Sequence, residues 1–161
     1  MVKLEFGIKH RGCLVNEASR ALPDLRILAP GGFLHGAKGA EEILVIDRPG
    51  PHDVDRFLNH FRGAPGIATV ELLERTPDKA FFRVYVTQNP PDGFCSEAVF
   101  RNRGLRVGLE VQVGGVEQWT VACFRREDAE NLVRDLQGMG DLTYHRIGEA
   151  SWGELLSPAR A

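Results

Sequence analysis

The sequence lacks a long hydrophobic run and a basic excess, and each absence excludes a class of protein. No apolar stretch approaches the roughly 20 residues that a membrane-spanning helix needs. Lysine and arginine together number 20 against 22 aspartates and glutamates, a net charge of -2. Proteins that bind a phosphate backbone usually carry a basic excess. We therefore expect neither a membrane protein nor direct nucleic-acid binding.

Cysteine is also scarce. The three cysteines, Cys13, Cys95 and Cys123, are odd in number and widely spaced, so they do not make a disulfide framework, and no CxxC pair marks a strong metal site. The amino terminus, from Met1 to Glu5, enters strand-like alternation directly, without the features of a signal peptide. We therefore expect a protein of the reducing cytoplasm.

The familiar catalytic signatures are missing as well. The sequence contains no HExxH motif, Ser-His-Asp arrangement or paired carboxylate set, so we expect a non-enzymatic protein. The glycine-rich segment 31–36 lies between two expected strands, whereas a phosphate-binding loop needs a helix after its glycines; we interpret the segment as part of a mobile hairpin. The alternative is a small enzyme of the ferredoxin-like class, with His35 or His145 as an acid–base group in a cleft between sheet and helices.

What the sequence does contain is a repeat. Residues 12–74 and 94–149 show the same order of signals: a cysteine that opens a short polar–apolar run, a strand-like run, a glycine pair, a second apolar run, an amphipathic helix and a closing strand. The two helical segments, 53–61 and 128–136, each carry an apolar stripe at helical spacing. Repetition at this length indicates one supersecondary unit used twice.

Each copy then needs one strand before its cysteine, and residues 4–8 and 80–87 alternate with a period of two. The order strand, helix, strand, strand, helix, strand is that of the ferredoxin-like βαββαβ unit. We predict an α+β fold made by tandem duplication of this unit, with antiparallel sheets and helices on one face. The predicted divisions are 1–76 for the first repeat, 77–150 for the second and 151–161 for a C-terminal tail.

The arrangement of the two copies is constrained by their bare sheet faces. Two copies side by side, or face to face, would cover those faces. The four-residue turn 76–79 between the copies is too short for a flexible linker, so it places the last strand of the first copy next to the first strand of the second.

The most suggestive side chains stand at the start of the first helix in each copy. Cys13 and Cys95 occupy these positions, where the positive helix end lowers the pKa of a thiol. His10 precedes Cys13 by three residues, and this pair, with Cys95 or Cys123 nearby in space, suits a thiophilic metal ion or an oxidant sensor. The alternative is that the cysteines are small buried apolar residues. We assign Cys123, in an apolar strand, to the core.

We accordingly predict an effector site near the two helix starts or beneath the loop 31–39. A metal ion there would be held by His10, Cys13 and Cys95. The predicted effector-binding residues are His10, Cys13, Asn16, Glu17, Cys95, Ser96 and Glu97.

The segment 81–86 resembles an RNA-recognition strand, because Phe81, Arg83 and Tyr85 fall on one face. That motif normally occupies the third strand of its fold, whereas this run opens a repeat. With no basic cluster in the chain, we expect these side chains to pack against the other copy.

A family resemblance rests on the run 9–19, Lys-His-Arg-Gly-Cys-Leu-Val-Asn-Glu-Ala-Ser, and on Leu22-Pro23-Asp24 after it. It resembles the opening of archaeal and bacterial regulators of the bacterio-opsin-activator type, which look like a sensory region followed by a helix-turn-helix. Residues 152–158 resemble the linker before the DNA-binding helices, and those helices are absent from this sequence.

The repeated unit is also similar to ACT-type regulatory domains, which bind small effectors between units. Together the resemblances imply a small-molecule or metal-sensing regulatory domain of a transcriptional-regulator-like protein, without DNA-binding helices of its own. They leave open whether the protein acts as a homodimer.

Overall fold

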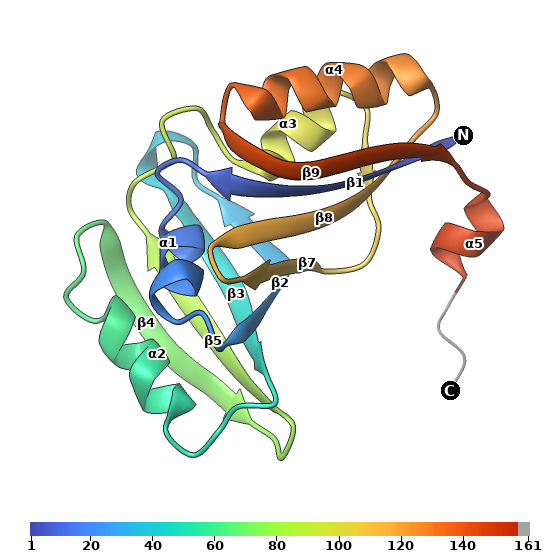
Figure 1. The fold of residues 1–161 in the computed structure, drawn as a ribbon. Coiled ribbons are helices and arrows are strands. Elements are labelled where there is room, and N and C mark those ends of the chain that lie inside the picture. Colours follow the sequence, from blue (N-terminus) through green and yellow to red (C-terminus); the bar gives the residue numbers. More distant parts are fainter. Residues whose placement is uncertain (158–161) are drawn as a thin grey trace.

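The computed structural model describes residues 1–157, which form an α+β fold with one nine-stranded antiparallel sheet and five α-helices (Figure 1). None of the helices in these residues is long and apolar enough to cross a membrane. The strands are β1 (Val2–His10), β2 (Arg26–Leu34), β3 (Ala40–Asp47), β4 (Ile67–Arg75), β5 (Lys79–Val86), β6 (Leu105–Arg106), β7 (Glu110–Val113), β8 (Val116–Cys123) and β9 (Gly140–Glu149). The helices are α1 (Leu14–Ala21), α2 (Asp53–Phe61), α3 (Cys95–Arg101), α4 (Arg126–Gln137) and α5 (Trp152–Leu156), with a 3₁₀ turn η1 (Gly36–Lys38).

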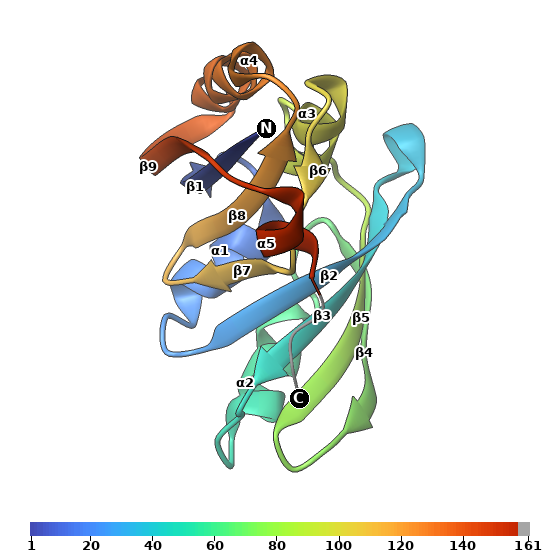
Figure 2. The same ribbon diagram turned by 90° about the vertical axis from the view of Figure 1, so that its right-hand side faces the viewer.

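The strands follow the order β4-β5-β3-β2-β7-β8-β1-β9, and β6 pairs with β8 beside this path. We call β4-β5-β3-β2, with α1 and α2, the first half, and β7-β8-β1-β9, with β6, α3 and α4, the second half. The halves are joined edge to edge by β2 and β7, which lie side by side in the middle of the molecule (Figure 2). The joint between β2 and β7 is called the seam below.

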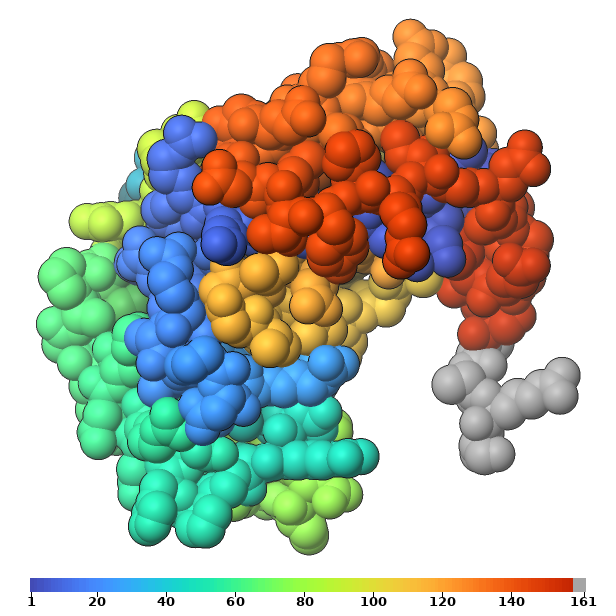
Figure 3. Space-filling view, viewed as in Figure 1, coloured from blue at the N-terminus to red at the C-terminus, as the bar shows by residue number. Residues whose placement is uncertain are grey.

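This pairing differs from the expected tandem of self-contained copies. β1, expected to open the first copy, lies in the second half between β8 and β9, and β5 lies in the first half between β3 and β4. In the space-filling view the blue atoms of β1 are enclosed by the red of β9 and the gold of β8 (Figure 3). The cause is the tight turn before β5: it holds β5 against β4, as predicted, so the inner position between β3 and β4 that was expected for β1 is occupied. The result is one continuous sheet in place of two.

Each half has its own hydrophobic core beneath its helices. In the first, Phe57 of α2 packs against Phe82 of β5 with ring centroids 4.3 Å apart. In the second, Phe6 of β1 stacks on Trp119 of β8 at 6.1 Å, and Leu132 of α4 is fully buried among β1, β8 and β9. The alternating strands and helical stripes of the sequence correspond to these buried faces.

The predicted glycine-rich loop is arranged differently from the expectation. β2 continues to Leu34 in register with β3, so residues 31–34 are paired strand where we expected an open hairpin loop. A bulge in β2 between Leu28 and Gly31 accommodates Pro30. A Cβ on Gly32 would lie 1.9 Å from the carbonyl oxygen of Glu41, so the close approach of β2 and β3 requires glycine at this position.

The face of β5 that carries Arg83 and Tyr85 contacts the first predicted copy, residues 1–76, as expected. Arg83 pairs with Glu71 of β4, and the Tyr85 hydroxyl donates to the carbonyl of Lys38, 3.2 Å away, both within the first half.

The C-terminal tail begins with a short helix. The Ser151 hydroxyl caps α5 by accepting from the Glu154 amide at 3.1 Å, and Trp152 packs on Phe124 at 5.4 Å between ring centroids. Residues 158–161, the last part of the predicted tail and linker, lie outside the described residues.

Candidate functional site

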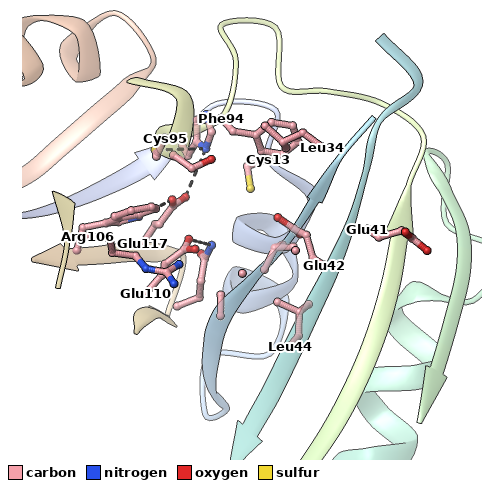
Figure 4. A pocket seen from close by; sticks show the side chains of 18 of the residues that line it. Cys13, Leu34, Glu41, Glu42, Leu44, Phe94, Cys95, Arg106, Glu110 and Glu117 are labelled. Carbon is pink, nitrogen blue, oxygen red and sulfur yellow. Dashed lines mark hydrogen bonds and ion pairs between the residues drawn. The ribbon is translucent and has the colours of Figure 1, made fainter. Parts of the chain in front are cut away.

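A cavity of about 310 Å³ lies at the seam, with walls from both halves of the molecule (Figure 4). We call it the seam cavity. Glu42 and Leu44 of β3 form one wall, and Glu117 and Trp119 of β8 form the opposite one. A ligand in this cavity would therefore contact both halves at once.

The path of the chain between the two halves explains why the two predicted helix starts meet here. The chain crosses the seam between β1 and α1, and again between β5 and α3, so each crossover places a helix start at the cavity. The crossovers touch: Gly12 has a φ of 72°, and a Cβ on it would lie 2.5 Å from Cδ of Pro91. Cys13 and Cys95 are thereby brought to one cavity from opposite halves.

His10 is fixed at the inner end of the cavity. Its ring is 1% exposed, and Nε2 lies 2.9 Å from the carbonyl oxygen of Gly93. A carbonyl only accepts, so Nε2 carries the proton, and Nδ1 has a lone pair in the neutral ring. Nδ1 lies 3.4 Å from Oε2 of Glu117 and 3.7 Å from Sγ of Cys95.

Glu117 is 3% exposed and is held by one strong hydrogen bond, since its Oε1 accepts from Nε1 of Trp119 at 2.7 Å. Its Oε2 has no hydrogen-bond partner among residues 1–157 in their ordinary protonation states. Burial alone would raise the pKa of Glu117, but the neighbouring side chains of His10, Glu110 and Trp119 together outweigh burial and lower it. An ionised carboxylate oxygen without a donor is costly inside a protein.

The cavity carries an excess of acidic groups. Burial and then repulsion by Glu117 raise the pKa of Glu42 to about 7, and the same two causes raise the pKa of Glu110 well above its ordinary value. Among the described lining residues Arg106 is the one arginine or lysine; its guanidinium lies over the Trp119 ring and donates to the carbonyl of a β2 residue. A cation bound among these carboxyl groups would relieve their mutual repulsion.

The two cavity thiols differ from the sequence prediction. Cys13 and Cys95 are 6% and 2% exposed, and burial, followed by the charge of Glu117, raises the pKa of both thiols. The prediction of a lowered thiol pKa is wrong because desolvation outweighs the helix dipole. Oxidant sensing needs an accessible thiolate, so this environment argues against that interpretation. Cys123 lies in the second core, as expected.

Four of the seven predicted effector residues line the seam cavity: His10, Cys13, Cys95 and Ser96. The other three do not line it, and two of them, Asn16 and Glu97, make structural hydrogen bonds. Asn16 donates from Nδ2 to the Gln112 side chain at 3.1 Å and to the Gly115 carbonyl at 3.0 Å, which ties α1 to the opposite half. Glu17 is exposed, and Glu97 caps α3 by accepting from the amide of Phe94 at 3.0 Å.

Sequence reasoning missed the acidic wall, Glu42, Glu110 and Glu117. A signal for Glu117 existed, because it shares a strand face with Trp119 and Val121, and a carboxylate on an apolar face is unusual. For Glu42 no comparable signal distinguishes it from Glu41. Glu41 also lines the cavity, but its carboxylate turns away from it (Figure 4) and pairs with His35.

Neither histidine proposed for an acid–base role lines the seam cavity. His35 is exposed and pairs with Glu41 at 3.1 Å, and His145 is exposed on β9. A third histidine, His10, occupies the cavity. Together with Cys13 and Glu117 it offers one ligand atom each within 4.8 Å of one another, a set that suits a metal ion.

Comparison with known families places this geometry in context. The family model described as HVO_2525_N, N-terminal, matches residues 3–142, from β1 into β9, and its span includes the whole seam cavity. The chain belongs to this family. A search of curated proteins found no match.

Proposed function

We propose that this member of the HVO_2525 N-terminal family is a sensing domain that binds a small molecule or a metal ion in the seam cavity. The observation that carries the proposal is Glu117: a 3% exposed carboxylate with one unpartnered oxygen, in a cavity walled by both halves. A buried polar group without a partner lowers folding stability, and such groups are retained where a ligand uses them.

The seam suits a device that shifts between arrangements. Three residue pairs join β2 to β7, whereas seven join β1 to β8 within the second half. One of the three pairs is Ala29 with Glu110, and both residues also line the cavity. A ligand there contacts the joint itself, so its binding free energy biases one arrangement of the halves over another.

We infer that the fold is a duplicated ferredoxin-like, ACT-like unit whose copies have exchanged first strands. The orders β4-β5-β3-β2 and β9-β1-β8-β7 support this, because β5 and β1 occupy equivalent positions in them. Exchange ties the two copies together and puts both crossovers at the cavity.

We further infer that the sensing domain serves a transcriptional-regulator-like protein. The run 9–19, which carries the resemblance to regulators of the bacterio-opsin-activator type, forms the crossover from β1 to α1 and supplies His10 and Cys13 to the cavity. On this proposal the described residues sense, and any reading of DNA belongs to other helices.

Native mass spectrometry of the protein purified from its own host tests the sensing role. We expect a bound species on the wild type and on the control Glu41→Gln, which alters the opposite face of β3. The isosteric Glu117→Gln variant should lose that species while keeping its circular dichroism spectrum. A wild type that carries nothing, and that no added metal ion or small cation stabilises against heat, would reject the proposal.

A further inference from the structure

The geometry points to a thiophilic divalent cation, Zn²⁺ by preference, as the ligand of the seam cavity; this inference rests on the proposed sensing function. We assign as its ligands Nδ1 of His10, Sγ of Cys13 and Oε2 of Glu117, with Sγ of Cys95 as the fourth. The site differs from the one predicted from sequence, because a carboxylate joins the histidine and the two thiols.

Two of the distances fit a tetrahedral ion. With Zn–N and Zn–O bonds of about 2.0–2.1 Å and Zn–S bonds of about 2.3 Å, the edges of a tetrahedron are about 3.4 Å for N to O and about 3.6 Å for N to S. The observed separations from Nδ1 of His10 are 3.4 Å to Oε2 of Glu117 and 3.7 Å to Sγ of Cys95. Cys13 lies within 4.8 Å of the His10 and Glu117 ligand atoms, whereas Cys95 is outside this group of three, so both thiols have to move toward the ion to complete the set.

The surrounding hydrogen bonds aim the ligand atoms at one point. The Gly93 carbonyl accepts from Nε2 of His10 and thereby leaves the lone pair of Nδ1 facing the cavity. Trp119 donates to Oε1 of Glu117, which leaves Oε2 free. Outer partners of this kind, a carbonyl behind the histidine and a donor behind the carboxylate, orient ligands in metal sites. Two lone pairs 3.4 Å apart repel each other unless a cation or a proton lies between them.

The donor types select the metal. Thiolate and imidazole favour Zn²⁺ and similar ions, whereas Mg²⁺ and Ca²⁺ prefer oxygen ligands alone. Zn²⁺ replaces the proton of each coordinating thiol, so binding releases one proton to solvent per thiol that coordinates. Glu42 and Glu110 also line the cavity, and a bound cation would relieve the repulsion between their carboxyl groups and Glu117.

The test uses the whole chain, stripped of metal with a chelator and kept reduced with a phosphine. Calorimetric titration with zinc chloride should give one Zn²⁺ per chain, and magnesium and calcium chlorides should give no binding. Cobalt chloride should give the thiolate charge-transfer absorption and intense visible bands of tetrahedral Co²⁺, and Zn²⁺ should abolish them. The cobalt spectrum is read on the wild type, so it does not depend on any variant folding.

Matched variants locate the ion. Cys13→Ser and Glu117→Gln should each weaken Zn²⁺ binding by at least about 100-fold, a loss at the upper end of that for outer-shell partners. Cys123→Ala, which removes a thiol from the second core, and Glu41→Gln should change affinity by less than about 3-fold.

A cobalt spectrum without thiolate absorption overturns the inference, and so does Zn²⁺ affinity that Cys13→Ser leaves unchanged. If either occurs while native mass spectrometry still finds an organic species that Glu117→Gln removes, the metal is wrong and the sensing function stands. If native mass spectrometry finds no bound species, the metal assignment and the sensing function are both rejected. The 3.4 Å contact between His10 and Glu117 is then an ordinary contact within the protein.

Discussion

Replacing Glu42 by glutamine should stabilise the metal-free protein, and the gain should grow with pH. Glu42 faces the cavity from β3, and burial, then repulsion by Glu117, raise its pKa from 4.5 to about 7, with His10 offsetting part of the shift. The folded protein therefore holds this proton more tightly than the unfolded chain does. The stability linked to Glu42 is present below about pH 4.5 and is lost as the pH rises to about 7.

The size of the effect follows from the shift. A change from 4.5 to about 7 corresponds to about 3.4 kcal/mol at about 1.36 kcal/mol per pKa unit. Glu42 is half-buried rather than enclosed, so solvent screening reduces this to about 1–2 kcal/mol. Glutamine has the same shape and no charge, and it removes this penalty.

Urea denaturation at pH 4 and pH 8, on protein stripped of metal, measures this penalty. The difference in unfolding free energy between Glu42→Gln and wild type should be near zero at about pH 4 and about 1–2 kcal/mol in favour of the variant at about pH 8. Glu41→Gln is the control, because Glu41 points to the other face and pairs with His35. A gain that is equal at both pH values, or that the control reproduces, would refute the reasoning.

Three further predictions concern stability. Phe82→Ala should lower the unfolding free energy by about 3–5 kcal/mol in urea denaturation, whereas Phe100→Ala, at an 85% exposed position, should change it by less than about 0.5 kcal/mol. Asn16→Ala should cost about 2–4 kcal/mol by the same assay, because it removes both buried hydrogen bonds across the seam; a cost below about 1 kcal/mol would contradict that role. Gly12→Ala should lower the melting temperature more than Gly36→Ala does, since both have positive φ but only a Cβ at Gly12 meets the opposite crossover; equal losses would argue against that contact.

Local sequence patterns were sufficient to predict most of the strands and helices. The alternation of Leu4, Phe6 and Ile8 and the stripe of α4 correspond to buried faces, and the short turn before β5 placed that strand beside β4 as predicted. These features depend on neighbours in sequence, which periodicity reports directly.

The partners of each strand were harder to predict than the strands themselves, because the alternating pattern of β1 is compatible with pairing in either half. β1 buries the same side chains against β8 and β9 as it would against β3 and β4, so alternation alone does not choose. The β4–β5 hairpin decides between the two halves, because β5 occupies the position between β3 and β4.

The candidate site was predicted only in part, because one of its residues is brought in by a strand pairing that the sequence pattern does not determine. His10 and Cys13 are close in sequence and could be paired by spacing, whereas Glu117 joins them only through the pairing of β1 with β8. A thiol at a helix start was assigned a lowered pKa, and the depth of burial, a tertiary property, reversed the sign.

X-ray absorption at the zinc edge of the Zn²⁺-loaded protein tests the central claim most directly. A cation held between the halves by the assigned side chains should show a sulfur shell at about 2.3 Å and a nitrogen and oxygen shell at about 2.0–2.1 Å, four ligands in all. An ion surrounded by nitrogen and oxygen alone, with no sulfur, would contradict a site made of Cys13, Cys95, His10 and Glu117.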